Sequence, residues 1–470
     1  MNTPPKILTI IVTWNKQDYV LDLLNSLQNL DYPEHALDVV VVDNASQDDT
    51  VALIKARFPA VKLLLNDENL GGTGGFNTGL AYAFAKAEGT YDYLWLLDND
   101  VVVHRQALSA LVSTLEHKPD VAVAGSTMLQ LDFPWRINEM GAYVDRVRGE
   151  LLLNRHHQVV PGWRGQAVQD LLAGPGDLSQ QLQHCQPAMD VDYVAAASLL
   201  IRAPVAKQAG LWLDFFIHFD DVEWCLRIAE LGHRIQVSAR SLIWHVSAAA
   251  KVPSWVLYYD NRNVLYLLAR HGVPEAVSIT RRYIAKKTVY YSLLGKPDLA
   301  DLHIQAVADF DRQTTGAKQL DQVAKAQPLA ALATLLSRPD ITQVLIPFTV
   351  DLQALNCQDL VIEAQRARPE LKIYYLLPPA NEPESPRAQL PKAIPLAVAK
   401  AKWRRYFSYW HMRGRFDLVW QSDYRPILPL SWVGKQVLFV NYENLCLRPA
   451  NHVARLGQHL KAAWRIWRQA

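Results

Sequence analysis

Long apolar runs alternate with amphipathic segments over the first hundred residues of the chain. Four runs have the apolar, β-branched character of strands that are buried on both faces: 7–14, 37–46, 61–72 and 94–103. Helical patterns lie between them, as in residues 19–30, where leucines recur at helical spacing. Strands alternating with helices predict a Rossmann-like α/β fold, with a mostly parallel sheet covered by helices on both faces.

Polar side chains collect where these predicted strands end. They are Thr13 and Asn15, Asp43 and Asn44, Asn66 to Asn69, and Asp98, Asn99 and Asp100. In parallel sheets of this kind, ligands bind outside the carboxyl ends of the strands. The sequence therefore predicts one ligand site along this edge, within reach of all four strand ends.

Two of these residues, Asp98 and Asp100, interrupt an otherwise apolar run. A buried carboxylate without a partner costs several kcal/mol or changes its protonation state. Three kinds of partner are consistent with the sequence: a cation, a loop of backbone N–H groups, or water.

Five glycines lie within residues 69–79, which we predict to be a loop that runs into a helix. The N–H groups of such a loop can approach an anion, and a helix N-terminus adds roughly half a positive charge. Gly74, Gly75 and Asn77 are the expected ligand contacts, and a flexible surface turn is the alternative. The segment is neither a P-loop nor a dinucleotide fingerprint, because it lacks Gly-Lys-Ser/Thr and does not follow the first strand.

Length and composition indicate a globular protein of two or three domains. The chain has 470 residues, of which 50% are apolar, and 48 basic against 46 acidic residues, so no overall field favours nucleic acid. The four cysteines are widely spaced, which argues against a zinc module or disulfide scaffold and favours a reducing compartment. The N-terminal apolar run is too short for a signal peptide, and no stretch reaches the roughly 18 apolar residues of a spanning helix. Membrane contact is therefore expected to be peripheral.

Four segments, in this order, resemble an inverting GT-A glycosyltransferase of family 2: IVTWN, VVVDNAS, NLGGTGGFNTG and LLDNDVVV. The resemblance implies a nucleotide-sugar donor, with Asp43 at its base or ribose. It also implies that Asp98 and Asp100 form the D-x-D pair that holds Mn²⁺ or Mg²⁺ on the diphosphate, whose developing charge the cation neutralises. The expected donor contacts at the strand ends and in the glycine segment are Thr13, Asn15, Asp43, Asn69, Gly74, Gly75, Asn77, Asp98 and Asn99.

An acidic segment at 213–235 carries three acids at the start of a predicted amphipathic helix. Acids at this position also complement a helix dipole, which is the structural alternative. The segment resembles the acceptor-side motif of galactofuranosyl- and rhamnosyltransferases, in which the second Asp is the general base. By that resemblance Asp221 takes the proton of the acceptor hydroxyl. The acceptor contacts are then Asp220, Glu223 and Trp224.

His245 ends the apolar run of SLIWHVSA, and Arg262 lies within VLYYDNRNVLYLLARHG. A histidine beside a tryptophan is more often a packed core residue, and the arginine also fits a solvated helix face. In the galactofuranosyl- and rhamnosyl-type enzymes, a Trp-His pair follows the acidic motif, and a Tyr-Tyr-x-x-Arg-Asn segment follows the His. The resemblance implies that His245 completes the metal site, which favours Mn²⁺, and that Arg262 pairs with the donor diphosphate or an acidic acceptor.

The motifs cover residues 5–275, and pattern alone describes the rest. We predict a GT-A domain over 1–250, a helical extension over 251–299 and a C-terminal α/β domain over 300–470. Four strands of the last domain are expected in ITQVLIPFTVDL, LKIYYLLPPA, FDLVWQSD and KQVLFVNYENL, with a Pro-rich loop at 378–395.

Two basic helices in this region bear on membrane contact. One carries Arg281, Arg282, Lys286 and Lys287 among aromatic residues, a pattern that suits an anionic membrane surface. The tail at 451–470 is basic and carries an apolar stripe, for which core packing and membrane docking are equally good accounts.

Together these features favour an inverting, metal-dependent glycosyltransferase that uses UDP-galactofuranose. The expected acceptor is a hydroxyl of a cell-surface glycan or lipid-linked oligosaccharide, as in O-antigen, capsule or galactan synthesis. A dTDP-rhamnose-dependent rhamnosyltransferase is the alternative, because VEWCLR is equally typical of that group. A nucleotide-sugar-binding scaffold is the non-enzyme alternative. The expected location is cytoplasmic, peripheral at the inner face of the cytoplasmic membrane.

Overall fold

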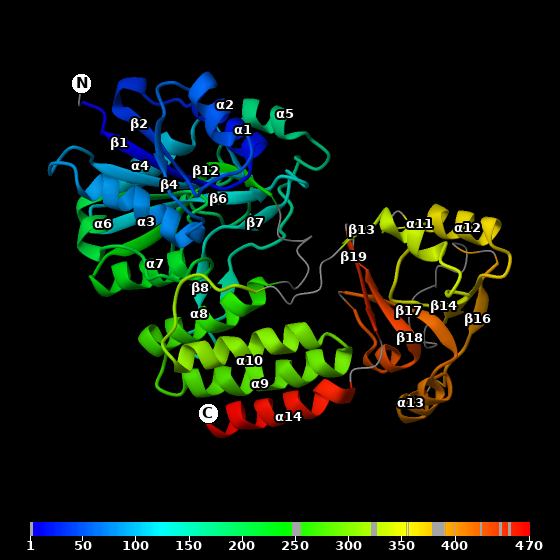
Figure 1. Ribbon diagram of the computed structural model, residues 1–470. Coiled ribbons are helices and arrows are strands. Elements are labelled where there is room, and N and C mark those ends of the chain that lie inside the picture. The colour runs from blue at the N-terminus through cyan, green and yellow to red at the C-terminus, as the bar shows by residue number, and fades with distance from the viewer. Residues whose placement is uncertain are drawn as a thin grey trace. The chain divides into compact units, whose positions relative to one another are not determined.

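The computed structural model divides into two compact units, each of which combines helices with a β-sheet (Figure 1). The described residues are 3–246, 255–320, 327–353, 355, 357–377, 390, 392–399, 401–423, 425–440, 444–449 and 453–470. Unit 1 comprises Met1–Ala248, Arg262–Thr280 and Asp309–Lys318. Unit 2 comprises Ala249–Asn261, Arg281–Ala308 and Gln319–Ala470.

Four parallel strands form one half of the large sheet in unit 1. They are β1 (Ile7–Thr13), β2 (Leu37–Asp43), β3 (Lys62–Leu65) and β4 (Tyr93–Asp98), in the order β4-β1-β2-β3. The register sets Thr13 opposite Asp43 and Val12 opposite Asp98, so the polar ends of β1, β2 and β4 lie at one edge. The strands predicted over 7–14 and 37–46 are confirmed, whereas β3 covers only the first part of 61–72 and has no buried residue, and the run 94–103 is divided into β4 and β5 (Val101–Val103).

The other half of this sheet is mixed. From β4 the order continues through β11 (Leu199–Arg202), β6 (Val121–Gln130), β12 (Arg234–His245) and β10 (Ala188–Val191). β11 runs antiparallel to β4 and β6, whereas β6 and β12 are parallel. Two short strands, β5 (Val101–Val103) and β7 (Ile137–Glu139), pair with β12 and β6 respectively. A separate two-stranded sheet joins β8 (Ala142–Val144) and β9 (Leu151–Leu153).

Helices cover both faces of the sheet in unit 1, as the alternating pattern predicts (Figure 1). On one face, α1 (Gln17–Leu27), α2 (Thr50–Arg57) and α4 (Ala107–Glu116) pack with Ile7 and Ile11 of β1. On the other, α3 (Gly71–Phe84), α6 (Ala203–Ala209) and α7 (Asp220–Glu230) pack with Leu8 and Ile10. Burial of successive β1 residues on two sides explains why that strand is almost entirely apolar. The short α5 (Val168–Ala173) also belongs to unit 1, and α8 (Val256–His271) contributes its second half.

The glycine-rich segment is helical, which corrects the loop predicted over 69–79. α3 begins at Gly71, whose φ is +69°, and the remaining glycines of the segment lie inside the helix. A Cβ atom at Gly75 would lie 2.3 Å from a Cγ atom of Val12. The glycines therefore let the helix lie close against β1, and close packing offsets their poor helix propensity.

Unit 2 contains a second sheet, in agreement with the predicted C-terminal α/β domain. The four predicted strands are β14 (Gln343–Pro347), β15 (Lys372–Leu376), β17 (Phe416–Ser422) and β18 (Gly434–Val440), which are parallel to one another. The sheet is extended by β16 (Ile394–Leu396), β19 (Asn444–Pro449) and β13 (Gln327–Pro328), and it is flanked by α11 (Ala331–Leu336), α12 (Gln358–Ala367) and α13 (Lys402–His411). The predicted Pro-rich loop at 378–395 lies largely outside the described residues.

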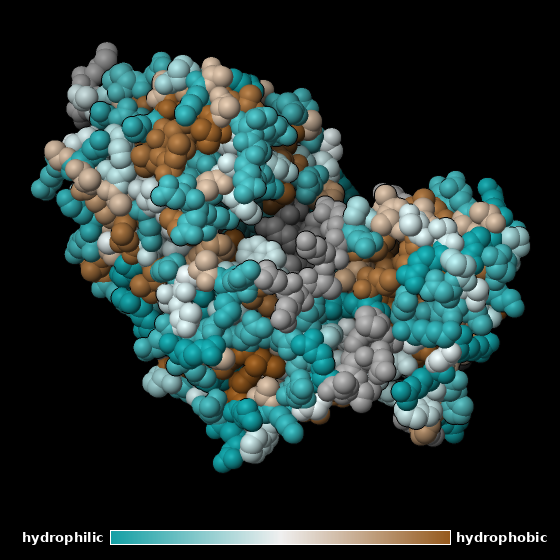
Figure 2. All heavy atoms as spheres, in the orientation of Figure 1, coloured by the Kyte–Doolittle hydropathy of each residue, from teal (hydrophilic) through white to brown (hydrophobic). Residues whose placement is uncertain are grey.

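Three long helices complete unit 2: α9 (Ala276–Leu294), α10 (Pro297–Asp311) and α14 (Val453–Arg468), the first two with one end each in unit 1. Buried ion pairs, Lys296 with Asp423 and Asp298 with Arg448, tie this helical layer to the second sheet. Figure 2 shows hydrophilic residues over most of the visible face, interrupted by hydrophobic patches. None of the helices in the described ranges combines the length and apolar character that crossing a bilayer requires.

Candidate active site

Asp98, Asp100 and His245 meet at the carboxyl edge of the sheet in unit 1. Asp98 ends β4, and β5 begins directly after Asp100. Because β5 pairs antiparallel with the end of β12, Val101 lies opposite His245. This pairing places His245 Nε2 3.0 Å from Asp100 Oδ1 and 4.0 Å from Asp98 Oδ2.

These three side chains form a donor set that suits a divalent cation. One ligand atom from each lies within 4.8 Å of the others. Carboxylate oxygens suit Mg²⁺ and Mn²⁺, and an imidazole nitrogen favours the transition metal. The side chains of Asp98, Asp100 and His245 are 43%, 24% and 17% exposed, so a cation held here would keep an open side toward a ligand. His245 is thus beside two acids and is not the packed core residue of the alternative interpretation.

Asp43 is a buried acceptor at the same edge with one unsatisfied oxygen. Its Oδ2 accepts the backbone N–H of Ser46 at 2.9 Å, whereas Oδ1 has no hydrogen-bond partner in the described structure. The residue is 2% exposed, and a buried acceptor without a partner costs about 1–3 kcal/mol. A ligand hydroxyl or N–H group would satisfy this oxygen.

The other predicted strand-end residues shape the loops along this edge. Asn99 Nδ2 donates to Thr13 Oγ1 at 2.9 Å and so joins the ends of β4 and β1. Asn15 has a φ of +49°, and its side chain accepts a backbone N–H from the loop after β2 at 2.7 Å. Asn69 accepts the N–H of Gly71 at 2.9 Å in the turn before α3. Contact of these four residues with a donor stays a prediction.

Gly74, Gly75 and Asn77 make internal contacts, which corrects the anion site predicted in this segment. The N–H of Gly74 donates to the carbonyl of Leu70 at 3.2 Å, and Gly75 faces β1. Both ends of the Asn77 amide bond the backbone of Trp212, at 2.8 and 3.0 Å. Because the N–H of Gly74 is already bonded, Gly75 is packed against β1 and Asn77 is bonded to Trp212, these residues do not form the expected cradle.

Asp220 and Asp221 begin α7 and have different partners. Asp220 is buried and accepts the hydroxyl of Thr73, and burial raises the pKa of its carboxyl. Asp221 is part-exposed and accepts the N–H of Ala196 at 3.1 Å. Loss of hydration, followed by the charge of Asp220 and with a contribution from Asp98, raises the pKa of Asp221 well above its ordinary value. A carboxylate with a raised proton affinity beside a metal site can act as a general base.

The backbone before Asp220 is held in an unusual conformation. Three of the four residues 216–219 have φ values of 65° to 67°, which residues other than glycine rarely adopt. Asn263 Nδ2 donates to three carbonyls within residues 215–218, at 2.8, 3.0 and 3.1 Å. Strained backbone of this kind persists only where its surroundings hold it. Asn263 therefore fixes the segment that leads into α7.

Arg262 shares this supporting role, which corrects its predicted contact with the donor. The side chain is fully buried, and its guanidinium donates to the carbonyls of Phe215 and Gly316, both at 2.9 Å. It also donates to Asn263 Oδ1 at 3.0 Å. A guanidinium bonded in this way inside unit 1 is not presented to a diphosphate.

Glu223 and Trp224 lie inside the core, which corrects their predicted contact with an acceptor. The carboxylate of Glu223 is fully buried and pairs with Arg227 at 2.7 Å and with Arg270 and His271 at 3.3 Å. Burial acts to raise its pKa, but hydrogen bonds from His271 and Arg227 outweigh burial and lower the pKa. Trp224 is also fully buried, and its Nε1 donates to a backbone carbonyl at 3.0 Å.

Glu139 is a titratable residue of this region that the sequence did not identify. It ends β7, is buried, and accepts the hydroxyl of Tyr193 at 3.4 Å. Burial raises its pKa to about 7, against the opposing effects of His245 and Tyr193, and its charge contributes to the raised pKa of Asp221. The available signal was a lone acid in the apolar stretch INEMGAYV, which no motif marks.

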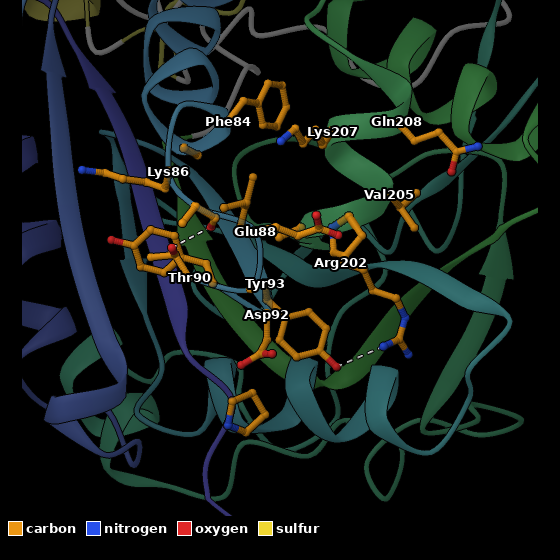
Figure 3. Close-up of a pocket in the computed structure, with 18 of the residues that line it drawn as sticks. Phe84, Lys86, Glu88, Thr90, Asp92, Tyr93, Arg202, Val205, Lys207 and Gln208 are labelled. Carbon is orange, nitrogen blue, oxygen red and sulfur yellow. Dashed lines mark hydrogen bonds between the residues drawn. The ribbon is translucent and has the colours of Figure 1, made fainter.

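A separate cavity of about 740 Å³ lies at the opposite edge of the sheet (Figure 3). Tyr93, which lines it, begins β4, whereas Asp98 ends that strand. Its polar lining groups bond one another: Arg202 donates to the Tyr93 hydroxyl at 3.2 Å, and that hydroxyl donates to Glu116. This cavity is therefore not part of the site at the carboxyl edge.

Comparison with known proteins finds that residues 9–162 match the family model described as Glycosyl transferase family 2. The chain is 24% identical over 255 residues to galactofuranosyltransferase GlfT2 of Mycobacterium tuberculosis, across 53% of this chain and 38% of that protein. It is 30% identical over 237 residues to glycosyltransferase AglE of Haloferax volcanii, across 50% of this chain and 64% of that protein. It thus spans less than two thirds of each of these curated relatives. A solved structure of S. aureus TarS 1-349 in complex with UDP-GlcNAc is similar at 18% identity and a TM-score of 0.41, over 65% of this chain and 80% of that chain.

Proposed function

Because the chain carries a glycosyl transferase family 2 domain, we propose that it is an inverting, metal-dependent glycosyltransferase acting from a nucleotide-sugar donor. The observation that carries the proposal is the grouping of Asp98, Asp100 and His245 beside Asp221. The first three supply a cation's ligands, whereas Asp221 is a carboxylate whose pKa is raised. A cation site and a proton acceptor at one sheet edge are the two requirements of direct sugar transfer to a hydroxyl.

In the proposed reaction, each acidic group has a separate task. Asp98, Asp100 and His245 would hold Mn²⁺ or Mg²⁺, and such a cation would supply positive charge to the diphosphate leaving group. Asp43 accepts a hydrogen bond from the nucleoside through its unsatisfied Oδ1. Asp221 takes the proton of the acceptor hydroxyl as the new C–O bond forms. Attack opposite the diphosphate inverts the anomeric centre.

We assign UDP-galactofuranose as the donor, with dTDP-rhamnose as the alternative. The relative GlfT2 is named as a galactofuranosyltransferase, and the motifs around Gly75 and His245 resemble that group. The proposed acceptor is a hydroxyl of a cell-surface glycan or lipid-linked oligosaccharide, as in O-antigen, capsule or galactan synthesis. The proposed location is cytoplasmic, with peripheral contact at the inner face of the cytoplasmic membrane.

A donor panel tests this function. The full chain would be incubated with UDP-galactofuranose, UDP-galactopyranose or dTDP-rhamnose, with and without Mn²⁺ and an acceptor glycan, and nucleotide release would be measured. We expect metal-dependent release from UDP-galactofuranose that rises with acceptor and falls in Asp221→Asn. Release from dTDP-rhamnose alone would replace the donor assignment. Donor binding without release under every condition would favour the scaffold alternative.

A further inference from the structure

We propose that the exposed faces of α9 and α14 form a docking surface for an anionic lipid bilayer. The inference deepens the proposed membrane location and rests on the proposed function only for its biological purpose. Binding to lipid is a property of these two helices in unit 2 and requires no donor, metal or acceptor.

Core packing and membrane docking are the two interpretations of the apolar stripe on the C-terminal helix α14, and the exposure of its side chains distinguishes them. Its buried face is formed by His459, Ala463 and Ile466, which are 2%, 5% and 5% exposed. Trp464 and Trp467, in contrast, are 58% and 45% exposed. One face of α14 therefore packs in the core of unit 2. The large aromatic side chains of the stripe lie on the exposed face, where they can contact a partner.

The buried face fixes the orientation of α14 within unit 2. His459 is hydrogen-bonded through Nδ1 to Ser292 of α9 at 2.8 Å and through Nε2 to Asp301 of α10 at 3.0 Å. Arg455 adds an ion pair with Asp301. The aromatic side chains of α14 thus lie on a helix whose orientation is set by contacts with α9 and α10.

The neighbouring helix α9 extends the same surface. Arg282 and Lys286 of α9 lie over the ring of Trp467, at 5.9 and 5.6 Å from its centroid, and Arg282 also bonds the carbonyl of Ala470 at 3.4 Å. On α9 itself, Lys287 lies near the rings of Tyr283 and Tyr290, which are 52% and 39% exposed. Cations and aromatic rings therefore interleave across both helices.

The positive charge of α9 and α14 favours an anionic lipid surface as the partner. The sequences of α9 and α14 contain eight basic residues and no acidic residue. Tryptophan and tyrosine favour the boundary between water and lipid, and nearby lysine and arginine favour anionic head groups. A second copy of the chain would bring two positive surfaces together, which opposes self-association through this face.

The test uses the full chain and vesicles, without donor or metal. Co-sedimentation would be measured with phosphatidylcholine vesicles and with vesicles that also contain phosphatidylglycerol. We expect binding to the anionic vesicles that weakens with salt, and a loss of roughly fivefold for each basic charge removed. Lys286→Glu with Lys287→Glu should abolish most of the binding. Trp464→Ala, at an exposed position, should weaken binding while leaving the melting temperature unchanged.

A matched control is available in the same unit. Arg366 and Lys372 are also exposed basic residues, and Arg366→Glu with Lys372→Glu makes the same change in net charge away from this surface. This control should bind anionic vesicles nearly as well as the unchanged chain. Equal losses of vesicle binding in both double variants would contradict the proposed docking surface. Undiminished vesicle binding by Lys286→Glu with Lys287→Glu would contradict it as well. A concentration-dependent dimer that Trp464→Ala dissociates, without vesicle binding, would assign the face to a second copy instead. Absence of sugar transfer would leave this result unaffected, so failure of the proposed function is recognised separately.

Discussion

His245 Nε2 lies 3.0 Å from Asp100 Oδ1, although one residue ends β12 and the other precedes β5. The contact depends on the short antiparallel pairing of these two strands, in which Val101 lies opposite His245. The third ligand of the site therefore comes from β12, which belongs to the other half of the sheet. The proposed metal site therefore forms only in the folded chain. Loss of any one of its three ligands should weaken metal binding at the whole site.

Removing any ligand of this site should weaken metal binding first. Asp98→Asn, Asp100→Asn and His245→Ala are each expected to lower Mn²⁺ affinity by about 10-fold or more, because each removes an atom from the cation's shell. Calorimetry with Mn²⁺ measures this effect without a donor. Asp43→Asn is the matched control, since Asp43 lies at the same edge outside the ligand set and should leave metal affinity unchanged. Unaltered Mn²⁺ affinity in all three ligand variants would show that these residues do not form a metal site.

Substitutions of Asp221 and Asp220 should affect different kinetic quantities. Asp221→Asn keeps the shape of the side chain but removes its proton acceptance, so turnover should fall by roughly 10²-fold or more, with donor affinity nearly unchanged. Asp220→Asn alters a buried carboxyl bonded to Thr73, so its main effect should be on stability and acceptor binding. Turnover and calorimetric donor affinity of both variants provide the comparison. Near-normal turnover in Asp221→Asn, with loss in Asp220→Asn, would transfer the role of base to Asp220.

The raised pKa of Glu139 predicts a pH-dependent stability. In the folded chain burial raises this pKa from 4.5 to about 7, so the folded state holds the proton more tightly than the unfolded state. Ionisation then opposes folding: the penalty is absent below the unfolded value, grows from there to about pH 7, and reaches roughly 3 kcal/mol above it. Glu139→Gln removes the penalty, so its stability relative to the parent should rise between pH 5 and pH 8.

Urea unfolding of the metal-free protein, with chelator present, measures this difference, because a bound cation would itself favour the ionised form. Glu88→Gln, at an exposed position, serves as the control and should show no such trend. A constant difference between Glu139→Gln and the parent from pH 5 to pH 8 would contradict the prediction.

Two glycines of α3 should differ sharply in their tolerance of alanine. A Cβ atom at Gly79 would lie 2.3 Å from Ile10 Cγ2 of β1, whereas one at Gly72 would have no neighbour within 4 Å. Gly79→Ala should therefore destabilise the chain by about 1–3 kcal/mol through overpacking. Gly72→Ala should be neutral or stabilising by up to about 1 kcal/mol, because alanine is the better helix former. Equal unfolding free energies of the two variants would show that α3 does not lie as close to β1 as described.

The sequence predicts the parallel half of the unit 1 sheet and the chemistry at its edge, because both depend on local patterns, whereas the mixed half carries no comparable signal. Apolar runs that end in acids mark β2 and β4, and the family resemblance connects His245 with Asp98 and Asp100 before any contact is known. The glycine segment is mispredicted because composition cannot show that a strand lies 2.3 Å from a missing Cβ atom. Glu223 and Arg262 are mispredicted for a related reason: their partners lie elsewhere in the chain, and only tertiary structure shows that both are buried and bonded.

Asn263 should affect catalysis from a distance, by holding the strained segment 216–219 ahead of Asp221. Asn263→Ala removes two hydrogen bonds to carbonyls of this segment and a third to the carbonyl of Phe215 just before it, which should cost about 1–3 kcal/mol of stability. Relaxation of the backbone would also move Asp221, and a displacement of about 1 Å can reduce turnover by roughly 10²-fold. Mn²⁺ affinity should remain unchanged, because the metal ligands lie on other elements.

Asn261 supplies the control for this variant. It lies on the same helix, and its Nδ2 donates within that helix to the carbonyl of Leu257. Asn261→Ala should therefore leave turnover near that of the parent. The comparison needs turnover, Mn²⁺ affinity and unfolding free energy for both variants. If Asn263→Ala lost stability but kept its turnover, the segment would be held by its other contacts, such as the Thr73 N–H to the Phe216 carbonyl at 3.2 Å, and Asn263 would serve the fold alone.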